Sequence, residues 1–226
     1  REFRRVLFRS HLIGIAVEEE RWNDVSTRAA DFLKRFPLSK QAPHAEFQSA
    51  NALLNQKQYK AAQLTLLTLK VDFQKVSPDE PLWVPQIWIM LAETYFRAKE
   101  YDEVTAVVSE LRTRDPKCPV LYQADEVLGR GFKNLAQFDE ARTAFRRVIA
   151  DPNGRRTETA AKSQFLLAET YLIQKDYKNA QAEHFKVYHL YRFPDWQSAS
   201  LYQAALCDEA LKRWNDAAKL YEELLK

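Results

Sequence analysis

A short pattern recurs six times along the chain and limits the possible fold more than any other feature. Each copy has one or two polar residues, an aromatic residue, two further residues, and then alanine or valine. The aromatic residues are Trp22, Tyr59, Tyr101, Phe138, Tyr177 and Trp214. They are spaced 37, 42, 37, 39 and 37 residues apart. A near-constant period of this length indicates a repeat architecture rather than a single globular core.

Other positions keep the same register as these aromatic residues. Nine residues before them stand Ile13, Ala50, Ala92, Gly129, Ala168 and Ala205, and three residues after them stand Val25, Ala62, Val104, Ala141, Ala180 and Ala217. Ten residues after them come Phe32, Leu69, Leu111, Val148, Val187 and Leu224. Offsets of 3, 7 and 10 share one side of an α-helix. Each repeat is therefore predicted to be a hairpin of two closely packed helices, with the aromatic residue at the turn.

Prolines mark where the second helix of a repeat ends. They are Pro37, Pro78, Pro116, Pro152 and Pro194, and the residue before a proline disfavours helix. The longest repeat contains the segment 77–85, which predicts an extended connector with Pro85 near the first turn of the next helix. The chain has only four glycines, and this composition favours an all-α fold over a sheet-rich one.

The residues at each of these repeated positions, called columns below, resemble those of the tetratricopeptide-repeat (TPR) family. The resemblance is carried best by Leu91-Ala92-Glu93-Thr94-Tyr95 with Tyr101, and by Leu167-Ala168-Glu169-Thr170-Tyr171 with Tyr177. It covers residues 11–226 and implies an α-solenoid of TPR-like helical hairpins that form a right-handed superhelix. The repeats are expected at 11–40, 41–81, 82–117, 118–154, 155–194 and 195–226. Two departures are a period longer than the family's usual length of about 34 residues and Asp208 in a column that is usually aromatic.

In this register the large aromatic residues of the repeats should form the core. The predicted core aromatics are Trp88, Tyr95, Phe132, Phe145, Phe165 and Tyr171. His184 falls in an apolar column, seven residues after Tyr177, and is expected to be a packed helix histidine rather than a ligand. Gly129 is expected to permit close helix packing, and Cys118 and Cys207 are expected to be small buried residues.

The first ten residues do not look native. The chain lacks an initial methionine, and the stretch from Glu2 to Ser10 resembles the translation of a common sequencing-library adapter. Residues 1–10 are therefore expected to be an artefact, and a genuine basic N-terminus is the alternative. Without them the chain has 30 basic and 30 acidic residues. A neutral surface of mixed sign disfavours nucleic-acid binding.

No pattern for chemistry stands out in the sequence. The four histidines have no metal-ligand spacing, and the two cysteines have no CxxC partner. Gly129-Arg130-Gly131 is too short to be a phosphate-binding loop. No stretch is long and apolar enough to insert into a membrane. The chain is therefore expected to be non-enzymatic, with no cofactor and no metal.

The TPR resemblance implies a site along the concave groove, which is lined by the first helix of each hairpin. Carried over by register, the peptide-groove candidates are Phe47, Asn51, Asn55, Gln86, Arg97, Gln123, Glu126, Arg130, Lys133, Asn134, Lys162 and Tyr202. His44, Ile89, Glu93, Phe165, Glu169 and Glu209 share that face. Asn51 fits one place of the carboxylate clamp of chaperone-binding TPR proteins, but Phe47 stands where the clamp has lysine, so that function is not expected.

The resemblance implies a bacterial scaffold or adaptor that binds a protein or peptide partner. The alternative is an accessory TPR region of a larger enzyme or cell-envelope assembly protein, whose working domain lies outside this sequence. An RNA-binding helical repeat is a third interpretation, which zero net charge and uneven repeat lengths disfavour. The junctions Phe36-Pro37 and Phe193-Pro194 resemble those of bacterial envelope-assembly TPR proteins. They favour an envelope or periplasmic location, with a cytoplasmic one left open.

Overall fold

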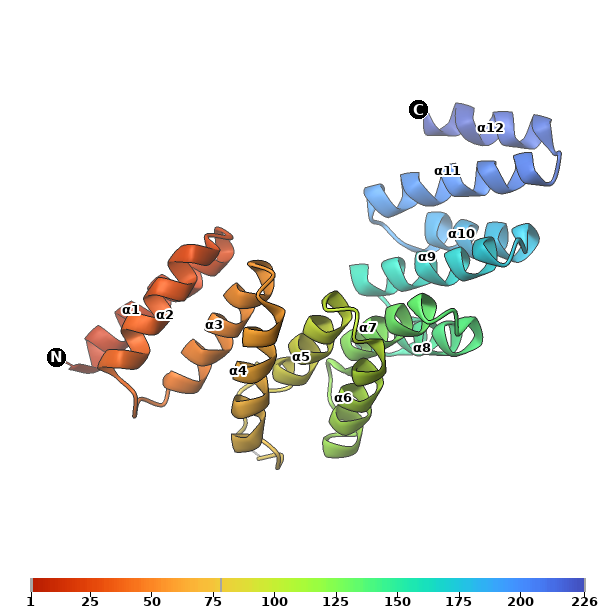
Figure 1. The fold of residues 1–226 in the computed structure, drawn as a ribbon. Helices are drawn as coiled ribbons and strands as arrows, with labels where there is room; N and C mark the ends of the chain where they lie inside the picture. Colours follow the sequence, from red (N-terminus) through yellow and green to blue (C-terminus); the bar gives the residue numbers. More distant parts are fainter. Residues whose placement is uncertain (1, 78, 226) are drawn as a thin grey trace. The chain divides into compact units, whose positions relative to one another are not determined.

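The computed structural model describes residues 2–77 and 79–225, which form twelve helices and, over those ranges, no strand (Figure 1). The prediction of an all-α fold is confirmed. The chain divides into two compact units, residues 1–116 and residues 117–226. Each unit contains three helical hairpins, and each hairpin has a first helix and a second helix.

In the first unit, the hairpins are α1 (Glu2–Glu18) with α2 (Trp22–Arg35), α3 (Ala42–Asn55) with α4 (Tyr59–Asp72), and α5 (Gln86–Arg97) with α6 (Tyr101–Arg114). In the second unit, they are α7 (Leu121–Asn134) with α8 (Phe138–Ala150), α9 (Glu158–Ile173) with α10 (Tyr177–Leu190), and α11 (Pro194–Ala210) with α12 (Trp214–Leu224). Within each unit every helix packs against the next, and each first helix also contacts the first helix of the following hairpin.

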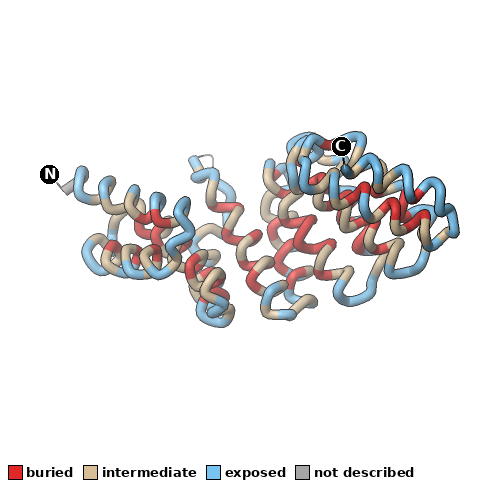
Figure 2. The backbone as a smooth tube through the Cα atoms, turned by 90° about the horizontal axis from the view of Figure 1, so that it is seen from above, coloured by how far each residue is buried: buried red, intermediate tan, exposed pale blue. Residues whose placement is uncertain are grey.

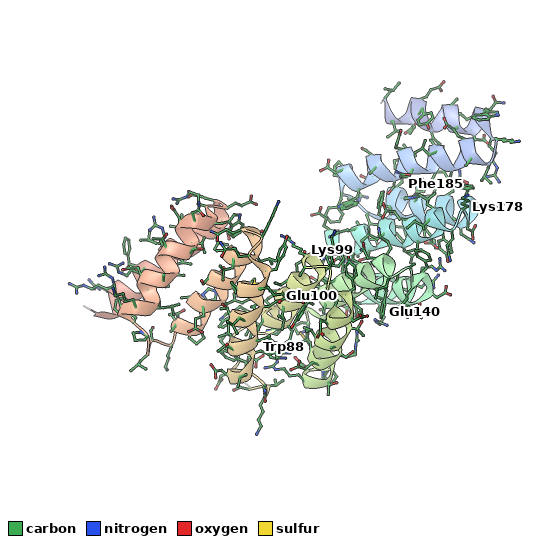
Figure 3. The ribbon with its side chains drawn as sticks, viewed as in Figure 1. Trp88, Lys99, Glu100, Glu140, Lys178 and Phe185 are labelled. Carbon is green, nitrogen blue, oxygen red and sulfur yellow. The ribbon has the colours of Figure 1, made fainter. Side chains whose placement is uncertain are left out.

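The six repeated aromatic residues are the first residues of the six second helices, as the repeat pattern predicted. Two residues before each aromatic, the backbone adopts a left-handed conformation with φ between 53° and 63°. The six left-handed residues are Glu20, Lys57, Lys99, Ala136, Lys175 and Lys212. At the α5–α6 turn, where Lys99 and Glu100 are labelled in Figure 3, the Lys99 N–H donates to the Phe96 carbonyl (3.0 Å) and the Glu100 N–H to the Tyr95 carbonyl (2.9 Å). This pairing caps the end of the first helix in every hairpin.

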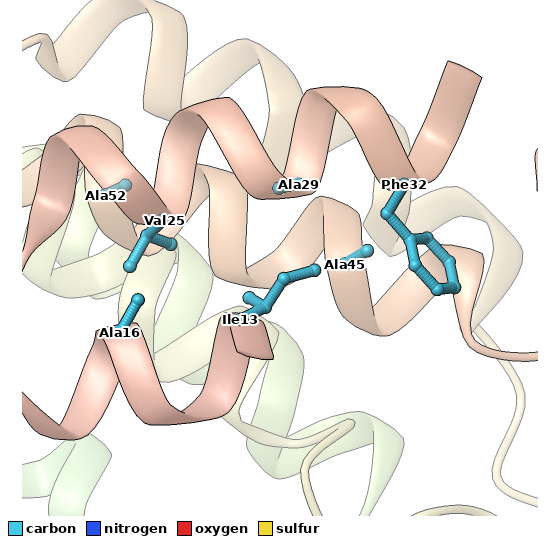
Figure 4. Packing of buried hydrophobic residues seen from close by; sticks show 7 residues of the cluster. All are labelled: Ile13, Ala16, Val25, Ala29, Phe32, Ala45 and Ala52. Carbon is cyan, nitrogen blue, oxygen red and sulfur yellow. The ribbon is translucent and has the colours of Figure 1, made fainter. Parts of the chain in front are cut away.

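The small residues of the repeat pattern lie between the helices. All the residues nine before and three after the turn aromatics are buried, and buried positions follow the inner sides of the helices in each unit (Figure 2). In the first hairpin, Ile13 and Ala16 of α1 meet Val25, Ala29 and Phe32 of α2 (Figure 4). Ala45 and Ala52 of α3 complete this cluster. Short side chains thus let neighbouring helices approach closely, as expected.

Gly129 shows how close that approach is. A Cβ atom built on Gly129 of α7 would lie 2.5 Å from Cε1 of Phe145 on α8, which is far inside van der Waals contact. The prediction that Gly129 serves close helix packing is confirmed. Phe145 is fully buried, because the missing side chain at Gly129 leaves room for its ring.

Of the six predicted core aromatics, Trp88 and Phe145 are buried. Tyr95, Phe132, Phe165 and Tyr171 are only half-buried, so the prediction was too strong for these four. The reason is the one-dimensional architecture: a thin stack of helices leaves the outer edge of a large ring at the surface. Cys118 and Cys207 are buried, as expected.

The connector between α4 and α5 is not extended. Its backbone forms consecutive i→i+3 turns, from the Glu80 N–H to the Ser77 carbonyl (3.0 Å) and from the Val84 N–H to the Pro81 carbonyl (3.0 Å). Val84 is fully buried. Pro85 immediately precedes α5, as expected. Pro78, one of the predicted stop signals, lies outside the described residues.

A single side chain of α6 holds this connector. Arg114 donates from Nε to the Phe73 carbonyl (2.7 Å) and forms an ion pair with Glu80. Its guanidinium also lies over the Trp88 ring, 4.6 Å from the centroid. Only 4% of the Arg114 side chain and 10% of the Glu80 side chain are exposed. A buried charge pair with an additional carbonyl contact fixes a segment that has no helix of its own.

Candidate functional site

The candidate groove residues of α7 lie along one side of that helix. Gln123, Glu126, Arg130 and Lys133 are spaced by three, four and three residues, and this spacing places them on a common face. Asn134 follows Lys133, and its side-chain amide donates to the Arg130 carbonyl (2.9 Å). Because α7 contacts α9, this face meets the first helix of the next hairpin.

Glu126 is the centre of the site. Only 5% of Glu126 is exposed. Its Oε1 lies 2.9 Å from Nε of Arg130 on the same helix and 2.9 Å from Nζ of Lys162 on α9. A carboxylate at such depth needs opposite charge close by to offset its lost hydration. The two cations supply it, and they also join α7 to α9.

A second ion pair joins the same two helices. Lys133 of α7, about two helical turns beyond Glu126, pairs with Glu169 of α9. The five side chains together contain three cations and two carboxylates. Their exposed fractions run from 16% for Arg130 to 35% for Lys162, apart from the more deeply buried Glu126. We call these five residues the α7–α9 charge cluster: Glu126, Arg130, Lys133, Lys162 and Glu169.

The structure therefore brings three predicted groove residues, Glu126, Arg130 and Lys162, into direct contact across two helices. A fourth, Lys133, pairs with Glu169 across the same two helices. Tyr202 lies on α11 and is 47% exposed, with its ring 6.0 Å from that of Tyr221 on α12. Phe165, which shares the predicted face, instead turns its ring toward His184 (5.0 Å) and Trp196 (5.4 Å). It belongs to the packing between α9, α10 and α11.

In the first unit the predicted groove residues do not form a comparable cluster. Phe47 is 6% exposed, because Trp83 of the connector covers it at 5.4 Å between ring centroids. Its assignment as a groove residue is wrong, since the ring is part of an aromatic packing contact with His44 and Trp83. The side-chain amide of Asn55 donates to both oxygens of Asn51, the carbonyl at 2.9 Å and Oδ1 at 3.0 Å.

The two remaining candidates of the first unit lie at opposite ends of α5. Gln86 begins the helix and is half-buried. Arg97 ends the helix, is exposed, and donates from Nε to Glu93 (2.7 Å). Arg97 also lines an open surface hollow of about 560 Å³, which lies between the α3–α4 and α5–α6 turns and is lined by Lys57, Lys60 and Lys99 as well.

One charge pair near the cluster was not predicted. Asp125, beside Glu126, is 3% exposed, and Arg147 of α8 donates to its Oδ1 from Nε (3.0 Å) and Nη2 (2.8 Å). The same position of the other repeats, thirteen residues before the turn aromatic, holds Glu46, Trp88, Gln164 and Leu201 among others, so the sequence carried no signal for this pair. This pair fixes α8 to the buried side of α7, while Glu126 faces α9.

The buried histidine has no polar partner. His184 is fully buried, and neither ring nitrogen has a hydrogen-bond partner. Burial lowers its pKa from 6.5 to about 4, so at neutral pH it is an uncharged core side chain, as predicted. Burial also raises the pKa of the Cys207 thiol to about 11, with a smaller contribution from Asp208, which keeps this sulfur in its unreactive protonated form.

Among the described residues, no group of three or more His, Cys, Asp or Glu side chains is arranged to hold a metal ion. Over the same ranges, the helices are too short or too polar to cross a bilayer.

These features define the class of the protein as a helical-hairpin repeat protein. Residues 199–226 match the family model for the tetratricopeptide repeat, and the described residues of the rest of the chain form hairpins of the same two-helix architecture. No curated protein sequence matches the chain significantly.

Solved structures of TPR proteins share its fold. A tetratricopeptide repeat protein from Parabacteroides merdae is 10% identical, with a TM-score of 0.68 over 97% of this chain and 78% of that one. A thermophilic TPR protein from Thermus thermophilus is 17% identical, with a TM-score of 0.60 over 94% and 98%. TPR-like repeats of a putative kinesin light chain from Podosopora anserina are 17% identical, with a TM-score of 0.63 over 80% and 92%. At these identities the likeness establishes the fold alone.

Proposed function

We propose that the chain is a non-catalytic scaffold that binds an extended peptide segment of a partner protein over the α7–α9 charge cluster. The observation that carries the proposal is the position of Glu126, whose buried carboxylate holds Arg130 and Lys162 on one partly exposed face. TPR proteins as a class bind protein partners, and here two first helices meet at a set of pre-positioned polar groups.

The charge of the cluster favours acidic peptides. Three cations face two carboxylates, so one positive charge is left over. Each lysine ammonium group carries three donors, and its ion pair with Glu126 or Glu169 occupies one of them. The remaining lysine N–H groups suit peptide carbonyls and carboxylates. Ion pairing to Glu126 and Glu169 also restricts the cations in advance, which lowers the entropy that binding must cost.

A random peptide library displayed on phage provides the probe. Selected peptides should be enriched in Asp and Glu, and a fluorescein-labelled winner should lose at least about tenfold in affinity when Lys133 and Lys162 are both changed to alanine. Binding should also weaken as salt rises, because partly exposed charges are screened. Fluorescence anisotropy measures both effects.

The matched control is Lys178→Ala. Lys178 is an exposed lysine on the second helix α10 (Figure 3), so its removal changes net charge without touching the cluster. Circular dichroism should show the same helix content for all variants. Equal affinity of the double variant and the Lys178→Ala protein would show that the cluster does not bind the peptide.

A further inference from the structure

One second helix carries an apolar stripe on its outer side. Leu64, Leu67 and Val71 of α4 are 68%, 37% and 62% exposed. Their spacing of three and four residues places all three on one face of the helix. Together they expose on the order of 300 Å² of apolar surface, a patch size that usually indicates recognition.

The repeat itself does not require this stripe. The three side chains stand five, eight and twelve residues after the turn aromatic Tyr59. At the same three positions α2 has Thr27, Ala30 and Lys34, α6 has Ala106, Ser109 and Thr113, and α8 has Thr143, Arg146 and Ala150. These three helices carry small or polar residues where α4 carries leucine and valine, and α10 has one large apolar residue there, Phe185, between Ala182 and His189. The outer face of α4 therefore has a requirement of its own.

We propose that this face is a self-association surface, on which α4 pairs with α4 of a second copy of the chain in antiparallel orientation about a two-fold axis. In that pairing Leu67 packs against Leu64 of the second copy, and Leu64 against its Leu67. A two-fold interface of this kind is formed by the same surface on both copies and therefore closes as a dimer.

The charges at the two ends of α4 favour the antiparallel pairing. Lys60 lies in the first turn, and its side chain is 79% exposed although it pairs with Glu100 (2.6 Å). Asp72 is the exposed last residue. Both have the unfavourable sign for the dipole of their own helix. Antiparallel pairing places each of them beside the opposite charge of the second copy.

The surroundings of Asp72 support this arrangement. Glu46 of α3 is close enough for the charge of Asp72 to raise its pKa, after the larger effect of burial. Two carboxylates, Asp72 and Glu46, therefore lie near each other at the C-terminal end of α4, where the Lys70 ammonium pairs with Glu110. A lysine from a second copy would relieve that repulsion, whereas a parallel pairing would add a second Asp72.

The size of the surface sets the strength expected. A fourteen-residue helix that contributes three apolar side chains and its flanking residues buries less than a standard stable interface of about 800 Å² per partner. The dimer should therefore be weak, with a dissociation constant on the order of tens of micromolar. The weight-average mass should rise from one chain mass toward two as concentration increases through that range.

Sedimentation velocity on the full chain tests the proposal, with Leu67→Glu as the disrupting variant and Ala106→Glu as its control. Ala106 is exposed on α6, five residues after Tyr101 as Leu64 is after Tyr59. Leu67→Glu should weaken dimerisation at least about tenfold, and Ala106→Glu should leave it unchanged. Circular dichroism melts confirm that both remain folded.

Asp72→Lys tests the orientation. It should weaken the dimer several-fold at low salt because it places lysine beside Lys60 of the second copy, and the effect should shrink at high salt. A wild-type protein that stays monomeric at a few hundred micromolar overturns the proposal. A dimer that Leu67→Glu does not weaken places the interface elsewhere, and a dimer indifferent to Asp72→Lys is not antiparallel. Because the α7–α9 charge cluster lies in the other unit, peptide binding is expected to survive in every one of these variants.

Discussion

The contribution of a single side chain to the stability of this protein depends on the space and the access to water that the neighbouring helices leave it. Two residues of the second unit, His184 and Gly129, are at opposite extremes. His184 has a polar ring that is buried away from water. Gly129 has no side chain, and the Phe145 ring occupies the space beside it.

His184 should make the stability of the second unit depend on pH. Its pKa is about 4 in the folded chain and 6.5 when solvated. Between these values the unfolded chain binds a proton that the folded chain does not. The free energy of unfolding should therefore fall as pH drops from 6.5 toward 4, by up to about 3 kcal/mol. Melting temperatures measured across this range check the effect.

Leucine at position 184 should remove this contribution and leave the acid sensitivity of the carboxylates. His189→Leu is the control, because His189 lies on the same helix but is exposed. If the His184→Leu and wild-type proteins lose stability in parallel below pH 6.5, the buried ring is not the titrating group.

Two glycine substitutions should have opposite effects. Gly129→Ala places a methyl group on the Phe145 ring and should cost about 1–3 kcal/mol, as overpacking of a core does. Gly14 of α1 has open space at the same atom, so Gly14→Ala should gain up to about 1 kcal/mol from helix propensity. Urea unfolding of both variants provides the comparison, and a neutral Gly129→Ala would mean that Phe145 moves aside freely.

At the scale of elements, the turn between the two helices of a hairpin is the most regular feature. All six turns have a left-handed residue followed two positions later by the aromatic residue. A left-handed conformation costs an L-residue roughly 1–2 kcal/mol, while glycine adopts it without that cost. None of the six is glycine.

Ala136→Gly should consequently stabilise the α7–α8 hairpin by about 0.5–1 kcal/mol, after the larger entropy of glycine in the unfolded chain is deducted. Ala106→Gly is the same exchange within the exposed middle of α6 and should cost about 1 kcal/mol. Chemical denaturation measures both. A loss of stability in Ala136→Gly would show that the alanine methyl group makes a contact that outweighs the backbone strain.

The regular elements were predictable because they leave a periodic trace in the sequence. Close packing favours a small side chain nine residues before the turn aromatic, as at Ala92, Gly129 and Ala168, and five of the six repeats have one. The hairpins could therefore be inferred from spacing alone. The connector could not, because one guanidinium holds it through partners 34 and 41 residues away in the chain, Glu80 and Phe73. Such a contact occurs once and has no period.

The same reasoning explains what was found of the candidate site. Glu126, Arg130, Lys133 and Lys162 were predicted from register, which fixes the face of a helix. Register does not say what covers that face. Phe47 was therefore misplaced, since Trp83 reaches it from an irregular segment. The stripe on α4 has a visible spacing of three and four residues, but it lies outside the repeat columns.

The whole molecule divides into two units. Within the described residues of a unit, each helix contacts only helices of its own hairpin and of the neighbouring hairpins. Stability in such arrays is close to a sum of terms from each repeat and its neighbours. A local defect should therefore loosen its own hairpin and the next one, and leave distant hairpins closed.

Arg114→Ala provides the test at this scale. It leaves the buried Glu80 carboxylate without its ion-pair partner and the Phe73 carbonyl without its donor. Removal of one member of a buried ion pair lowers the free energy of unfolding by about 3–5 kcal/mol. Hydrogen exchange followed by mass spectrometry should show faster exchange in α4, α5 and α6. The helices α11 and α12 should exchange as in the wild-type protein. Arg114→Lys should recover only part of the protection, because a single ammonium cannot replace the fork of donors.

A uniform rise in exchange across all helices would contradict this expectation, since it would mean that the chain opens as one cooperative body. Faster exchange confined to residues 73–85 would show that the connector is held by Arg114 but does not support α5.

The strained turns have a consequence for the evolution of the chain. Each of the six left-handed positions is a separate site at which one exchange to glycine adds stability, and effects at distant sites add. Their sum is on the order of 3–6 kcal/mol, a large part of what holds a typical domain together. Descendants of this protein that acquire glycine at these turns can tolerate destabilising substitutions on their binding faces. They can therefore acquire new partners without losing the fold.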